Sequence, residues 1–302
     1  MGKKEEVTED IGRSDIEEIS RNVHVIKTVY EKGFNQKWLF VSDVHYDSIK
    51  CKRELLKKHF DQAKKQGARI GIIGDWFDLM GGKYDPRTSY SDIRPEYKHI
   101  DYMDQVVNDS YEFLKPYVDN ITLIAHGNHE TSYLKRTHTN PLQQLVDRLN
   151  YMENPKEKII LSGYAGWLIL KFMDVYGGGI RTKKILYWHG QRSNAQRSKG
   201  VLQIDLDTMK FPDVDIIMKG DDHNKWYYPM SGRFMLDANY KVKQTFQRHI
   251  RLGSYKDGLE DFYHGWEVEK GFQPLGFGGF WIDFYLKNRD IKIKVIDTND
   301  EN

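Results

Sequence analysis

The sequence predicts an α/β fold in which short buried strands alternate with helices. Three apolar runs in the first half of the 302-residue chain have the length and bulk of buried strands. These runs are residues 38–42, 70–73 and 121–125. Helical patterns are expected between and after them, at residues 52–66, about 97–114 and 141–149. Alternation of strand and helix along a chain is typical of layered α/β folds.

The first expected helix has the clearest pattern. Leu55, Leu56, Phe60 and Ala63 recur at the spacing that places apolar side chains on one face, and Gly67 is typical of a helix C-terminus. The second half of the chain is dominated by strand-like runs, at residues 159–161, 167–172, 184–188 and 214–218. Alternating apolar and polar residues up to about 295 predict further strands.

Composition and charge limit the possible domain organisation and class of protein. Residues 1–20 are highly charged and are expected to form a tail or a short exposed helix, followed by a single domain over residues 21–300. Lysine and arginine total 46 against 44 aspartates and glutamates, a net charge of +2, so the strong basic excess of a dedicated nucleic-acid coat protein is missing. Cys51 is the single cysteine, which excludes an intrachain disulfide, and no apolar run reaches about 18 residues. A cytoplasmic protein without a membrane span is therefore expected.

Polar side chains of the metal-binding type follow five of the strand-like runs. They are Asp43 and His45, Asp75, Asn128 and His129, His189, and Asp221 with His223. Each group alone has an ordinary explanation, such as a helix cap for an aspartate or a buried hydrogen-bonded histidine. Open α/β sheets, however, gather ligands at the carboxyl ends of their strands. The five groups together therefore predict one shared metal site.

In order and context these residues resemble the calcineurin-like metallophosphoesterase superfamily. The resemblance rests on D-x-H at residues 43–45, G-D-x-x-D at 74–78, G-N-H-E at 127–130, the isolated His189, and G-x-x-H at 220–223. It implies two facing mixed β-sheets flanked by helices, a four-layer αββα sandwich. It also implies one metal ion among Asp43, His45, Asp75 and His223, and a second among Asp75, Asn128, His189 and Asp221. Asp75 would bridge the two ions, and His129 would be the catalytic general acid.

One position departs from the family pattern. The resembled motif ends in G-H-x-H, and Asp221 stands where its first histidine is expected. A carboxylate adds negative charge and a hard oxygen, which favours Mn²⁺ or Mg²⁺ over Zn²⁺. Two divalent ions are therefore expected, Mn²⁺ first, with Mg²⁺, Fe and Zn²⁺ as alternatives. Asp222 is a competing ligand for the second ion.

The expected activity is hydrolysis of a phosphodiester, in nucleic acid or a nucleotide derivative, by two-metal activation of water. DNA or RNA is thus a candidate partner. The alternatives are a phosphomonoesterase or protein phosphatase, and a non-catalytic scaffold with this fold. Arg192 and Arg197 are candidate substrate-binding residues, because they follow His189 in a polar loop. Asp47 or Asp78 is a candidate to orient the ligand histidines, and Trp76 to line the substrate cleft. The sequence does not predict an oligomeric state.

Overall fold

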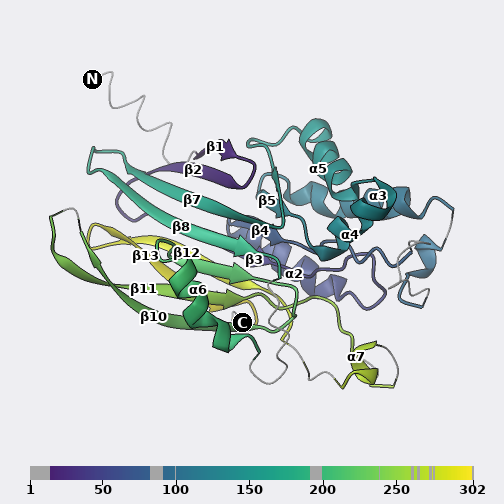
Figure 1. The fold of residues 1–302 in the computed structure, drawn as a ribbon. Helices are drawn as coiled ribbons and strands as arrows, with labels where there is room; N and C mark the ends of the chain where they lie inside the picture. The colour runs from purple at the N-terminus through teal and green to yellow at the C-terminus, as the bar shows by residue number, and fades with distance from the viewer. Residues whose placement is uncertain are drawn as a thin grey trace.

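The strands form two mixed sheets that face each other, with helices flanking them (Figure 1). The computed structural model describes residues 14–81, 91–98, 100–190, 199–237, 239–259, 262–263, 266–271, 274 and 276–300. The seven-stranded sheet has the order β1 (Ser14–Ser20), β2 (Val23–Tyr30), β7 (Ala165–Asp174), β8 (Ile180–Trp188), β9 (Ile216–Lys219), β11 (Val242–Arg251) and β10 (Trp226–Leu236). The six-stranded sheet has the order β13 (Asp290–Asp297), β12 (Phe280–Lys287), β3 (Asn35–Val41), β4 (Arg69–Ile73), β5 (Ile121–Ala125) and β6 (Ile160–Ser162).

Both sheets combine parallel and antiparallel pairs. Strands β3, β4, β5 and β6 run parallel in the six-stranded sheet, and β8, β9 and β11 run parallel in the other. The helices are α2 (Arg53–Lys65), α3 (Tyr102–Leu114), α4 (Asn128–Thr137), α5 (Pro141–Met152), α6 (Ile204–Lys210) and α7 (Trp266–Glu269). Short 3₁₀ segments are η1 (Pro95–Tyr97), η2 (Lys115–Tyr117) and η3 (Val201–Gln203). The α/β class with two mixed, helix-flanked sheets is confirmed.

Two apolar cores lie on opposite faces of the six-stranded sheet. Alternate residues of a strand point to opposite faces, so Trp38 and Phe40 of β3 enter the core between the sheets while Leu39 and Val41 enter the core beneath the helices. Helices α2, α3 and α5 contribute to that second core. The central strands of this sheet are therefore buried on both faces, which is why they read as continuous apolar runs in the sequence.

The outer face of the seven-stranded sheet carries a smaller cluster. Leu186, Val214 and Ile217 are buried there, and Phe211, directly after α6, packs against them. Figure 1 shows α6 in front of this sheet, whereas α3, α4 and α5 lie together at the other side of the molecule. Within the described residues, no helix combines the length and the apolar character needed to cross a bilayer.

Two details differ from the sequence-based expectation. The expected tail through residue 20 is wrong for residues 14–20, which form β1 and pair antiparallel with β2. An edge strand needs backbone partners on one side only, so a polar segment without an apolar run can form one. Residues 1–13 lie outside the described residues. The helix expected from about residue 97 begins at Tyr102, after the separate turn η1 that starts at Pro95.

Candidate metal centre

The loops after β3 and β4 are joined by backbone hydrogen bonds beyond the ends of the strands. Asp43 N donates to Gly74 O (3.2 Å), and Val44 N and His45 N donate to Asp75 O (2.8 and 3.1 Å). The parallel pairing of the strands thus continues into the two loops that carry the polar side chains. Backbone hydrogen bonds therefore fix the position of these loops relative to each other.

The seven-stranded sheet reaches the same place through contacts across the sandwich. His189 follows the end of β8, and its Nδ1 donates to Ile73 O at the end of β4 (2.8 Å). Asp221 N, after β9, donates to both carboxylate oxygens of Asp43 (3.1 and 3.0 Å). These contacts bring the strand ends of both sheets to one centre.

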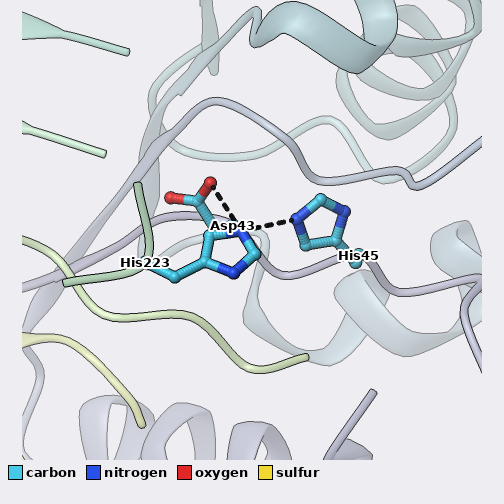
Figure 2. Close-up of side chains that lie close together, drawn as sticks. All are labelled: Asp43, His45 and His223. Atoms are coloured by element: carbon cyan, nitrogen blue, oxygen red, sulfur yellow. Dashed lines mark hydrogen bonds and ion pairs between the residues drawn. The ribbon is translucent and has the colours of Figure 1, made fainter. Parts of the chain in front are cut away.

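The first group of candidate ligands is Asp43, His45 and His223 (Figure 2). The Nε2 atoms of His45 and His223 are 3.3 Å apart, and His223 Nε2 lies 3.4 Å from Asp43 Oδ1. His45 Nδ1 lies 2.8 Å from the Asp78 carboxylate, so the ring has Nε2 on the side of His223. Two imidazole nitrogens and a carboxylate oxygen that converge in this way fit a shared divalent cation.

The second group is Asp43, Asp75 and His189. His189 Nε2 lies 3.2 Å from Asp75 Oδ2 and 3.2 Å from Asn128 Oδ1. Because His189 Nδ1 donates to a backbone carbonyl, Nε2 is the atom available to a metal ion. Asp43 is the residue that these two groups share, whereas Asp75, the bridge that the resemblance implies, belongs to the second group alone.

His129 lies beside these groups rather than within them. Its backbone N, in the first turn of α4, donates to Asp75 Oδ1 (2.9 Å), and its Nε2 is 3.8 Å from Asp75 Oδ2. The Nδ1 atom donates to the backbone carbonyl of Asp78 (2.5 Å). His129, His45 and Asp78 form a third group with the spacing of a metal site. The ring is therefore fixed at one nitrogen and presents the other to the centre.

The electrostatics of the centre are those of charges gathered for a cation. Burial opposes ionisation of Asp43 and Asp75, but His189 outweighs it for both, together with His223 for Asp43 and His129 for Asp75, so both pKa values are lowered. Burial likewise opposes protonation of His189 and His223, but the neighbouring carboxylates raise the pKa values of both rings. A divalent cation bound between these groups would interact favourably with the same carboxylates.

Five of the candidate ligands have a left-handed backbone conformation. Their φ angles are 51° for Asp43, 49° for His45, 47° for Asp75, 73° for Asp221 and 55° for His223. Such a conformation costs a residue other than glycine roughly 1–2 kcal/mol. Strained backbone of this kind concentrates at functional sites, where the rest of the fold holds it in place.

Asp221 lies near the centre without joining any of the three groups. The pKa of its carboxyl is raised to about 6, mainly by burial; His189 opposes the rise, and Asp43 and Asp75 add to it. Its role as a ligand remains a prediction. Asp222 instead lies against the buried Arg251, with Oδ2 3.4 Å from Nη1, which disfavours Asp222 as the competing ligand.

The remaining predicted residues have different outcomes. Asp78 contacts His45 as expected of an orienting carboxylate, whereas Asp47 accepts hydrogen bonds from the backbone N of Asp78 and Leu79 (2.6 and 3.0 Å). Trp76 is fully buried and stacked on Tyr46, so the prediction that it lines a substrate cleft is wrong. Arg192 and Arg197 lie outside the described residues.

Sequence reasoning missed several residues that support the centre. Ser42 Oγ donates to Asp43 Oδ2 (2.5 Å), and Glu130 accepts from Gly127 N and Phe77 N (2.8 and 2.9 Å), tying the start of α4 to the loop after β4. Lys256 Nζ lies 3.0 Å from both oxygens of Asp78. Ser42 and Glu130 are neighbours of predicted ligands and could have been proposed from position. Lys256 follows none of the recognised motifs and carries no sequence signal.

No protein-family model and no curated protein matches this sequence. Solved structures with a similar arrangement include a metallophosphoesterase from Sphaerobacter thermophilus, at 13% identity over 87% of this chain and 89% of that one, with a TM-score of 0.33. Vps29 with zinc from Entamoeba histolytica has 10% identity, coverage of 87% and 99%, and a TM-score of 0.32. GAP50 of Plasmodium has 12% identity, coverage of 89% and 86%, and a TM-score of 0.39. At these TM-scores the likeness carries no argument about activity.

The resemblance to a known superfamily rests on features of this chain. It has the five motifs in order, two facing mixed sheets, and strand ends that bring aspartates and histidines to one centre. In these features it resembles the calcineurin-like metallophosphoesterase superfamily.

Proposed function

We propose that this protein is a metal-dependent phosphoesterase that uses two divalent ions to hydrolyse a phosphodiester. The observation that carries the proposal is that Asp43, His45, Asp75, His189 and His223 form two groups that share Asp43, and that the ligand atoms within each group lie within 4.8 Å of one another. These residues come from strand ends in both sheets, and their oxygen and nitrogen donors suit Mn²⁺, Fe or Zn²⁺.

The donor set fits a pair of ions. Asp43, His45 and His223 would hold one, and Asp75, Asn128 and His189 would hold the other, with Asp221 as a further ligand. Asp43 or Asp75 would lie between them. Two such ions lower the pKa of a water molecule and neutralise the phosphoryl oxygens during in-line attack.

His129 has the position of a general acid. Its Nδ1 donates to the Asp78 carbonyl, so a proton on Nε2 would face the centre. That proton would pass to the leaving-group oxygen as the phosphorus–oxygen bond breaks. In this proposal Asp75, whose Oδ1 accepts from the backbone N of His129, also fixes the start of α4 against the metal ligands.

A diester of a nucleic acid or nucleotide is the proposed substrate. The support is the polar sequence that follows His189, in which Arg192 and Arg197 are the predicted contacts for substrate phosphate. Mn²⁺ is the proposed native ion because Asp221 adds a hard oxygen donor.

The test compares three substrates with Mn²⁺ at neutral pH: bis-p-nitrophenyl phosphate, p-nitrophenyl phosphate and single-stranded DNA. The proposal expects hydrolysis of the diesters and its loss with a chelator. Good cleavage of the monoester alone would assign the protein to the phosphomonoesterases. Absence of hydrolysis of all three in a protein that binds Mn²⁺ would favour a scaffold.

A further inference from the structure

Asp78 is a buried residue that contacts two histidines with different tasks, since its carboxylate faces His45 and its backbone carbonyl accepts from His129 Nδ1. Its side chain is 1% exposed, with Oδ1 2.8 Å from His45 Nδ1 and 3.6 Å from His129 Nδ1. In the proposed function His45 binds a metal ion through Nε2, and His129 donates a proton. A shift of Asp78 would therefore displace a metal ligand and the general acid together.

A lysine from a distant part of the chain holds this carboxylate. Lys256 Nζ lies 3.0 Å from both Asp78 oxygens, and its side chain is 10% exposed. A buried carboxylate needs a compensating charge or hydrogen-bond donors. Lys256 supplies that charge in a geometry that engages both oxygens at once.

The backbone around Lys256 is itself attached to the centre. Ser254 Oγ and Tyr255 N donate to the carbonyl of Asp43 (2.8 and 3.0 Å). On the other side, Lys52 N donates to Tyr255 O (2.8 Å) and Asp257 N donates to Lys50 O (3.0 Å). The segment 254–257 thus has fixed partners on both sides of Lys256, one of which is the backbone of a candidate ligand.

We propose that Lys256 is a positioning residue of this site: it clamps Asp78, which in turn orients His45 toward a metal ion and His129 toward the substrate. This inference rests on the proposed function. The contact through which Lys256 acts in this proposal is the one that its Nζ makes with both carboxylate oxygens of Asp78.

The experiment measures kcat and KM for bis-p-nitrophenyl phosphate and Mn²⁺ affinity by calorimetry in Lys256→Met. We expect kcat to fall about 10–100-fold and Mn²⁺ affinity about tenfold, the usual effect of losing a partner of a metal ligand. The KM should stay within about twofold, because the lysine orients groups rather than binding substrate. The matched control is Lys52→Met, which removes the neighbouring ion pair with Asp257 (2.7 Å) but no contact with Asp78. Equal behaviour of the two variants, or an effect on KM alone, would overturn the proposal.

A double-mutant cycle separates positioning from general damage. In an Asp78→Asn background, adding Lys256→Met should change kcat and Mn²⁺ affinity by less than about twofold, since the lysine has no carboxylate left to clamp. Independent, multiplying losses would contradict the proposed route. The double variant also removes both buried charges, so it remains testable if Lys256→Met alone folds poorly.

An error in the proposed function would be distinguishable from an error in this inference. If the wild-type chain hydrolysed no phosphoester, the proposed enzymatic function would be wrong. The Mn²⁺-affinity cycle would still decide whether Lys256 acts on His45 through Asp78.

Discussion

The two sheets contribute to the centre in different ways. The six-stranded sheet delivers Asp43, His45 and Asp75 from adjacent loops whose backbones hydrogen-bond to each other. The seven-stranded sheet delivers His189 and His223 from strands that reach the centre across the inter-sheet core. One half of the site is thus set by local strand pairing, and the other half depends on how well the sandwich is packed.

The largest expected effect comes from the residue that joins the two halves. Asp75→Asn removes the carboxylate that contacts His189 from one side and His129 from the other. Loss of metal-derived stabilisation should raise the activation free energy by several kcal/mol, which lowers kcat about 10³–10⁴-fold. Calorimetric titration should also show weaker binding of both Mn²⁺ ions. Asp222→Asn, whose carboxylate faces Arg251, is the control, and unchanged Mn²⁺ binding in Asp75→Asn would refute the junction role.

His129→Asn tests a residue of the six-stranded half that is expected to act without holding an ion. Turnover should fall about 10²–10³-fold, the usual range for a lost general acid. Mn²⁺ stoichiometry by calorimetry should stay the same. His126→Asn provides the comparison, because His126 lies two residues before α4 and hydrogen-bonds to Ser162 O instead (2.8 Å). A fully active His129→Asn would remove this residue from the mechanism.

Gly74→Ala is expected to separate the two halves. A Cβ at Gly74 would lie 2.3 Å from His189 Nδ1, and the residue has φ +78°. His189 should be displaced from Ile73 O and Asp75, weakening Mn²⁺ affinity about tenfold or more. Gly67→Ala has a similar φ of +60° but nothing within 4 Å, so it should cost about 1 kcal/mol of unfolding free energy and leave Mn²⁺ binding intact. Indistinguishable Mn²⁺ affinities in the two variants would show that the sheets do not meet tightly at Gly74.

The last prediction concerns the pH dependence of stability and a residue outside the centre. Burial lowers the pKa of His59 to about 4, and its Nδ1 lies 2.8 Å from the Tyr255 hydroxyl. The unfolded chain takes up a proton near pH 6.5 while the folded one does so near 4, so stability is lost as pH falls through this window. The loss should be about 2–3 kcal/mol in unfolding free energy. The test measures the unfolding free energy in urea at pH 7 and at pH 4. His59→Gln should reduce the difference between the two values, and the same difference in the variant and the wild type would contradict this account.

The comparison of the two halves also explains what could be predicted from sequence. Buried strands such as β4 and β5 appear as apolar runs because both faces are covered, and the residues after them mark the carboxyl ends where ligands gather. Thus Asp43, Asp75 and His189 could be placed in one centre before any geometry was known.

Other features carry no comparable signal. Strand β1 was missed because it is polar and pairs on one edge only. The clamp on Asp78 was missed because Lys256 lies 178 residues away from it and follows no motif. The position of Trp76 inside a site motif favours a cleft-lining side chain, but the side chain packs into the core beneath the helices.

The left-handed backbone conformation of five candidate ligands has a consequence for directed evolution. These residues are Asp43, His45, Asp75, Asp221 and His223. Glycine adopts that conformation without penalty, so replacing any of them with glycine would relieve backbone strain while deleting a donor. Any relief of strain from glycine at these positions would therefore come with the loss of a candidate metal ligand. Mutagenesis for higher stability should therefore leave these five residues unchanged and target other positions.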